Sequence, residues 1–189
     1  MAWIETIHES EATGDLAALY KRVGNPDGSV DNVMKVHALN PTSLRAHFDL
    51  YVQAMHKPSP LSRAEREMVA TEVSRLNGCD YCLAHHNLGL RRLLPPERHD
   101  AAEALREGDH TGLNDRERAM VEYARKLTLA PHDMEEGDVS ALRAAGLDDR
   151  SILDLAQCIG YFNYVNRIVT GLGVALGEGE GQAGQWPEE

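Results

Sequence analysis

Apolar residues recur at the three- and four-residue spacing of an α-helix through most of this chain, and no stretch alternates long enough to predict a β-strand. The spacing therefore predicts an all-α fold, a helical bundle interrupted by turn signals such as "GNPDG" and "KPSP". The expected helices cover residues 16–23, 33–39, 41–55, 62–76, 79–94, 97–106, 115–129, 135–145 and 149–176.

The 189 residues are enough for one domain with a sizeable core. We expect a single all-α domain over residues 1–176. The remaining segment, 177–189, is rich in Gly and Glu, which predicts a flexible acidic tail.

Two segments of the chain resemble each other. "LSRAEREMVA" (61–70) and "LNDRERAMVE" (113–122) align without gaps and share Leu, Glu, Arg, Met and Val at matching places. Helix starts often look alike because capping residues and charged first turns are common. Duplication is the other reading, and it predicts two related helical halves of which only the first carries a C-x-x-C.

The charge balance restricts the partners. Thirty acidic residues against 19 basic ones give a formal net charge of -11, with no basic patch, so neither nucleic acid nor an anionic membrane is an expected partner. The apolar stretch 152–176 is interrupted by polar and charged residues and does not predict a membrane span. The N-terminus lacks the layout of a secretory signal, which with three cysteines predicts a reducing, cytoplasmic location.

The stretch "NGCDYCLAHH" (77–86) carries the candidate chemistry. On a helix, Cys79, Cys82 and His86 share one face, and a C-x-x-C at a helix start lies within disulfide range. The helix N-terminus stabilises a thiolate, and a histidine one turn later can accept the thiol proton. This arrangement supplies a nucleophile, a resolving thiol and a base.

An orienting carboxylate for His86 has two candidates in the preceding helix, Glu67 and Glu72. On one continuous helix Glu67 would stand ~18 Å from Cys79. The Asn77-Gly78 pair predicts a break that lets the two helices fold back on each other. A carboxylate beside His86 would fix its tautomer, and the spacing alone does not choose between the two glutamates.

The spacing E-x11-C-x-x-C-x-x-x-H, formed by Glu67, Cys79, Cys82 and His86, resembles that of the alkylhydroperoxidase D-like branch of the carboxymuconolactone decarboxylase superfamily. Four blocks resemble its peroxidase-related subgroup in the same order: 31–41, 59–86, 113–131 and 161–174. The resemblance covers roughly residues 30–176. It implies an all-α homo-oligomer with a redox core at about 41–94 and a related second half at about 113–176.

The resemblance also implies a thiol peroxidase that needs no cofactor and no metal. A Glu67–His86 relay would activate Cys82, which would attack a small-molecule hydroperoxide, and Cys79 would resolve the sulfenic acid. An external dithiol, lipoyl-like or thioredoxin-like, would reduce the disulfide. The dipole of the helix favours Cys79 as the thiolate, so the division of roles stays open. The residue before the second cysteine, often histidine in the best-known members, is Tyr81.

Two rival interpretations remain. One keeps the dithiol without peroxide chemistry, as a lipoyl- or protein-disulfide-linked redox adaptor. The other is a non-catalytic helical module whose Cys79, Cys82, His85 and His86 bind a metal. Adjacent histidines on a helix diverge by about 100°, which disfavours their reaching one ion. A carboxylate-backed base favours thiolate chemistry.

Other polar residues are expected to be structural. Cys158 falls at an apolar helical spacing and should be a buried, inert thiol. Hydrogen bonds between helices or subunits are expected for Asn163, Asn166 and Arg167, and close helix packing for Gly171 and Gly173. Tyr81 and Leu83 are candidates for an apolar mouth beside the dithiol. Solvated or capping roles are expected for the histidines at 37, 47, 56 and 132.

Overall fold

A computed structural model describes residues 2–177, and within that range every regular element is a helix, so the predicted all-α class is confirmed. The predicted tail falls outside the described residues from position 178 onward. Three short 3-10 turns cover Glu9–Glu11, Pro96–Arg98 and Pro131–Asp133. The α-helices are α1 (Gly14–Val23), α2 (Asn32–Lys35), α3 (Pro41–Met55), α4 (Arg63–Leu76), α5 (Asp80–Leu93), α6 (His99–Arg106), α7 (Asp115–Leu129), α8 (Glu136–Ala144) and α9 (Asp149–Gly171).

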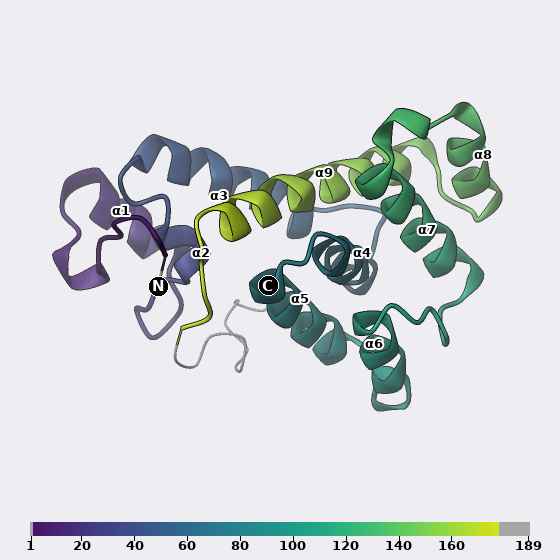
Figure 1. Cartoon of the computed structure of the whole chain (residues 1–189), viewed down its shortest axis with the longest axis horizontal. Coiled ribbons are helices and arrows are strands. Elements are labelled where there is room, and N and C mark those ends of the chain that lie inside the picture. Colours follow the sequence, from purple (N-terminus) through teal and green to yellow (C-terminus); the bar gives the residue numbers. More distant parts are fainter. Residues whose placement is uncertain (1, 178–189) are drawn as a thin grey trace.

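Helix α4 lies at the centre of the molecule. Figure 1 shows it nearly end-on, with α9 above it, α5 and α6 below it and α7 to one side. Its residues 66–74 are all buried, including Arg66, Glu67 and Glu72. Buried charges need partners, and α4 therefore places its polar side chains against specific groups on its neighbours.

Apolar side chains from these helices form two buried clusters. The larger one joins α1, α3, α4 and α9, and it includes both sulfur atoms of the C-x-x-C pair. The smaller one lies between α4, α5, α6 and α7 and contains Met68, Leu90, Leu94, Ala102, Leu105, Leu113 and Val121. Because α4 contributes to both, it is held from both sides, and so are the functional groups that it carries.

The two segments that resemble each other both begin helices. Ser62 caps α4 and Asn114 caps α7, each in a reciprocal capping box with the glutamate three residues later. The helices pack against each other, and Arg116 of α7 donates to Glu65 of α4 at 2.7 Å. The capping boxes account for the shared glutamate, and duplication stays a prediction.

Two predicted helix ends are wrong. The helix expected over 33–39 is only the short α2, followed by turns. The last helix ends at Gly171 and not at 176, because Gly173 takes a left-handed conformation with φ of 61°. A Cβ at Gly173 would clash with the Trp3 ring, so the close contact there is with the N-terminal segment and not with another helix.

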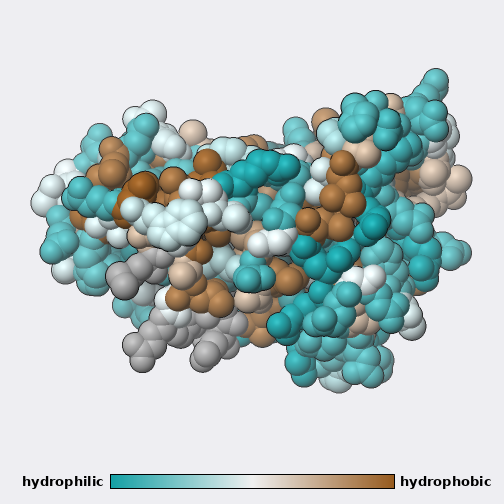
Figure 2. All heavy atoms as spheres, viewed as in Figure 1, coloured by the Kyte–Doolittle hydropathy of each residue, from teal (hydrophilic) through white to brown (hydrophobic). Residues whose placement is uncertain are grey.

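The surface is mostly polar. Figure 2 shows hydrophilic residues over α6 and the α7–α8 end, and apolar patches toward the middle of the molecule. Exposed large apolar side chains on α3 and α9 include Leu50, Leu153 and Tyr164. Scattered exposed apolar residues are normal in single chains, so a homo-oligomer stays a prediction. Within residues 2–177 no helix is both long and apolar enough to cross a membrane.

Candidate active site

The turn between α4 and α5 sets the position of the two cysteines. Gly78 adopts φ of 63°, and the Cys79 amide then donates to the Ser74 carbonyl at 2.9 Å. Helix α5 begins at Asp80, one residue later than predicted, so Cys79 is its N-cap residue, and the Cys79 side chain does not cap the backbone. Cys82 follows in the first turn.

The two cysteines are buried free thiols whose Sγ atoms lie 2.7 Å apart. Their exposed fractions are 2% for Cys79 and 3% for Cys82. A disulfide between them can therefore close through small side-chain movements, without rearranging α5.

A carboxylate backs His86. Its Nδ1 lies 2.7 Å from Oε2 of Glu67, which reaches across from α4. Glu72, the alternative carboxylate, turns elsewhere: it accepts from Arg75 at 2.8 and 2.9 Å and lies 3.6 Å from His110. The structure thus brings Glu67 and not Glu72 to His86. It follows that the His86 proton sits on Nδ1 and leaves Nε2 for the cavity.

Arg63 extends this pair. Its Nη2 donates to Oε1 of Glu67 at 3.1 Å, and its Nη1 lies 2.8 Å from Nδ1 of His56. Burial raises the pKa of Glu67, but the attraction of His86 and Arg63 outweighs burial and leaves it below its ordinary value. Burial, followed by the charge of Arg63, lowers the pKa of His56 to about 4, so this histidine is a neutral acceptor.

Sequence reasoning missed Arg63 and misjudged His47. The four-residue spacing of Arg63 and Glu67 was the signal for their ion pair. His47 is buried against His37, with ring centroids 4.5 Å apart, and burial lowers its pKa to about 3. The solvated or capping role expected for His47 is wrong because α3 turns its ring toward α9, where the Tyr161 hydroxyl lies 3.5 Å from Nε2 of His47.

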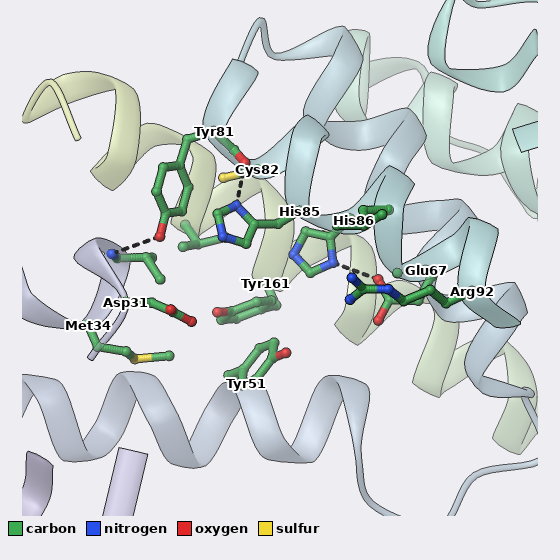
Figure 3. A pocket seen from close by; sticks show the side chains of 14 residues that line it. Asp31, Met34, Tyr51, Glu67, Tyr81, Cys82, His85, His86, Arg92 and Tyr161 are labelled. Carbon is green, nitrogen blue, oxygen red and sulfur yellow. Dashed lines mark hydrogen bonds and ion pairs between the residues drawn. The ribbon is translucent and has the colours of Figure 1, made fainter. Parts of the chain in front are cut away.

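A cavity opens beside Cys82, His86 and Glu67. Its mostly apolar wall comes from α2, α3, α5 and α9 and includes Val33, Met34, Tyr51, Tyr81, Leu88, Tyr161 and Val165. Figure 3 shows the tyrosine rings of α3 and α9 facing the two histidines of α5. Tyr81 lines this cavity as expected, whereas Leu83 and Cys79 are not among the lining residues.

The two thiols have opposite tendencies to ionise. The hydrogen bond with Cys82 lowers the pKa of Cys79, assisted by contacts with Thr170 and Asn166 of α9. The same pairing, together with burial, raises the pKa of Cys82. The negative charge thus favours Cys79, whereas Cys82 is the thiol that lines the cavity. Because the sulfurs are in contact, the two thiols titrate as one pair and charge can move between them.

Gly89 allows Glu67 to approach α5. It lies one turn beyond His86, and a Cβ there would stand 3.1 Å from Cδ and 3.2 Å from Oε2 of Glu67. A side chain at this position would push the carboxylate away from the helix. Sequence reasoning missed Gly89, and the glycine inside an otherwise helical stretch was the available signal.

The remaining polar residues have structural contacts. Cys158 is fully buried, with Sγ 3.8 Å from the sulfur of Met55. Asn77 Nδ2 donates to Oδ1 of Asn166 and Asn163 at 3.0 and 3.2 Å, which confirms hydrogen bonding between helices. No three His, Cys, Asp or Glu side chains among residues 2–177 are grouped so that they could hold a metal ion.

Known proteins are similar to this chain in sequence, and two solved structures are similar to it in fold. The model of the carboxymuconolactone decarboxylase family matches residues 41–126. An uncharacterized peroxidase-related protein from Silicibacter sp. TM1040 is 33% identical, with a TM-score of 0.77 over 88% of this chain and 85% of that one. A protein from Ralstonia eutropha JMP134, described as an alkylhydroperoxidase AhpD core and an uncharacterized peroxidase-related protein, is 26% identical. Its TM-score is 0.85 over 96% of this chain and 97% of that one. Uncharacterized protein YdfG of Bacillus subtilis (strain 168) is 25% identical over 138 residues, 72% of this chain and 91% of YdfG.

These likenesses place an all-α chain, with a C-x-x-C pair in the matched segment, among the alkylhydroperoxidase-like proteins. The chain belongs to the carboxymuconolactone decarboxylase family.

Proposed function

We propose that this chain is a thiol-dependent hydroperoxide reductase in which Cys79 and Cys82 cycle between dithiol and disulfide. Family membership and the peroxidase-related neighbours suggest an oxidoreductase with a role in peroxide reduction. One observation supports the dithiol cycle in particular. Glu67 contacts His86 at the cavity that Cys82 lines, and the Cys79 sulfur lies 2.7 Å from the Cys82 sulfur.

In the first step, His86 receives the Cys82 proton through Nε2 while Glu67 stabilises the positive charge on the ring. The Cys82 sulfur attacks the distal peroxide oxygen, so an S–O bond forms and the O–O bond breaks. The sulfur is oxidised to a sulfenic acid, and the peroxide is reduced to an alkoxide that takes up a proton and leaves as alcohol.

In the second step, the Cys79 thiolate attacks the sulfenic sulfur. A disulfide forms, and the departing hydroxide takes the proton held by His86 and leaves as water. The lowered pKa of Cys79, caused first by its hydrogen bond with Cys82, supports this role, because Cys79 is the more easily ionised thiol of the pair. An external dithiol, lipoyl-like or thioredoxin-like, then reduces the disulfide and completes the cycle.

Intact-mass analysis and peptide mapping of reduced, chelator-treated protein test the proposal. One equivalent of an organic hydroperoxide is added to the wild type and to the variants His86→Ala and Glu67→Gln. We expect rapid loss of two hydrogens as a Cys79–Cys82 disulfide in the wild type and at least a tenfold slower reaction in both variants, since a positioned base contributes about 10²–10⁴-fold.

Two controls separate the site from general effects. Cys158→Ala removes a thiol that is fully buried and should react like the wild type. Glu72→Gln removes the buried carboxylate that does not contact His86, and it should also react like the wild type once folded. If the wild-type thiols stay reduced, or if all variants are oxidised equally fast, the proposed activation is wrong and a disulfide-exchange adaptor becomes the better account.

A further inference from the structure

We propose that His85 is a second catalytic histidine, which protonates the alkoxide that leaves when Cys82 attacks a hydroperoxide. The inference rests on the proposed peroxide chemistry and adds a residue to it. His85 and His86 would then divide the two protons of the reaction between them.

His85 lines the same cavity as Cys82 and His86. The two histidines lie three and four residues after Cys82 on α5, so both belong to the helix face that carries the sulfur. Figure 3 shows the two imidazoles side by side over the cavity, with Tyr51 and Tyr161 opposite them. Adjacent histidines diverge too far to share one metal ion, but they can flank a larger molecule bound above Cys82.

The two rings are held by different groups. Nδ1 of His86 faces the Glu67 carboxylate, whereas Nδ1 of His85 lies 2.9 Å from the backbone oxygen of Tyr81. A carbonyl oxygen only accepts hydrogen bonds, so Nδ1 of His85 carries a proton and Nε2 is the atom that gains or loses one. The His85 ring is further held against the Tyr81 ring, with centroids 4.4 Å apart.

The cavity lining carries charges of both signs, two carboxylates and the Arg92 guanidinium. Asp31, which is 3% exposed, and Glu67 both contribute to the cavity lining. Figure 3 places the Asp31 carboxylate on the His85 side of the cavity and Glu67 on the His86 side. Arg92 lies with Glu67 on the His86 side in the same view, so Asp31 is the charged group on the His85 side. In this proposal Asp31 stabilises the protonated His85 ring, whose Nε2 is the proton donor.

The proton balance explains a use for two histidines. The proton taken from Cys82 stays on His86 until the Cys79 thiolate displaces hydroxide from the sulfenic acid, and it then forms water. The alkoxide leaves one step earlier and needs a different proton, which Nε2 of His85 supplies. Solvent returns that proton to His85 before the next turnover.

The test compares oxidants whose leaving groups differ in basicity. Rates of dithiol oxidation are measured with tert-butyl hydroperoxide, which releases a strongly basic alkoxide, and with peracetic acid, which releases weakly basic acetate. A proton donor matters only for the first. For His85→Ala we expect the rate of dithiol oxidation to fall about a hundredfold with tert-butyl hydroperoxide, which is the scale of general acid catalysis. With peracetic acid the rate should fall less than about threefold.

Matched variants keep the result interpretable. His85→Phe preserves a ring against Tyr81 but has no proton to give, so it should lose as much as His85→Ala. His86→Ala should slow both oxidants alike, and the exposed His132→Ala should slow neither.

Equal losses with both oxidants, or no loss with either, in folded His85 variants overturn the role of His85 and leave the proposed function standing. A wild-type protein that reacts with neither oxidant overturns both.

Discussion

The substitution Gly89→Ala tests whether the position of the Glu67 carboxylate controls the reaction. The new Cβ would meet Cδ of Glu67 at 3.1 Å and Oε2 at 3.2 Å. Carbon atoms in contact prefer about 3.5–4.0 Å, so the carboxylate must retreat by about 0.4 Å. Movement away from α5 stretches the 2.7 Å contact between Glu67 and His86.

The expected magnitude follows from the strength of that contact. A hydrogen bond to a charged group contributes about 1.5–3 kcal/mol, and we expect about 1 kcal/mol of it to be lost. That loss slows dithiol oxidation about fivefold. The free energy of unfolding should not fall in parallel with the rate. Alanine in a helix interior is favoured over glycine by about 1 kcal/mol, and this gain offsets the cost of the displaced ion pair.

The assay combines rapid-quench mass analysis of the dithiol after addition of tert-butyl hydroperoxide with urea unfolding. Gly160→Ala is the matched control, since Gly160 lies within α9 and a Cβ there has no atom within 4 Å. It should stabilise the protein by about 0.5–1 kcal/mol and leave the rate unchanged. A Gly89→Ala protein that reacts as fast as the wild type, or a Gly160→Ala protein that slows as much, would refute the reasoning.

Three further substitutions probe the surroundings. Arg63→Gln removes a charge that lowers the pKa of Glu67. The wild type loses rate and stability only as pH falls through that lowered pKa, so the variant should lose both at a higher pH. If the acidic side of the variant's pH–rate and pH–stability profiles is not shifted, this role of Arg63 is contradicted. Asn166→Ala should raise the pKa of Cys79, seen as a later rise of thiolate absorbance on titration, and an unchanged titration speaks against the contact. Cys158→Ala should lower the free energy of unfolding by about 1–2 kcal/mol without slowing oxidation, and a slowed reaction would show that this thiol takes part.

The sequence predicted the helices well where local signals are strong. Capping residues at Ser62 and Asn114 and the Asn77-Gly78 turn act within a few residues, so spacing alone identifies them. The last helix was overextended because apolar periodicity continues through Val174, which is buried after the helix has ended. Periodicity reports burial and does not by itself report helical backbone.

The site was predictable in composition but not in its contacts. Spacing left Glu67 and Glu72 equivalent, and only the crossing of α4 over α5 turns Glu67 to His86 and Glu72 to Arg75. Burial of His47 and the fit of Glu67 against Gly89 likewise depend on which helices become neighbours. These are tertiary properties, and residue type and spacing do not encode them locally.

The most direct test of the central claim is to trap the first oxidised sulfur. A Cys79→Ser variant cannot form the disulfide, so after one equivalent of tert-butyl hydroperoxide a sulfenic acid should persist and react with dimedone. Peptide mapping should then find the adduct on Cys82, the sulfur that lines the cavity beside His86. Absence of an adduct on Cys82, together with a sulfenic acid on Cys79 in the reciprocal Cys82→Ser variant, would contradict the account.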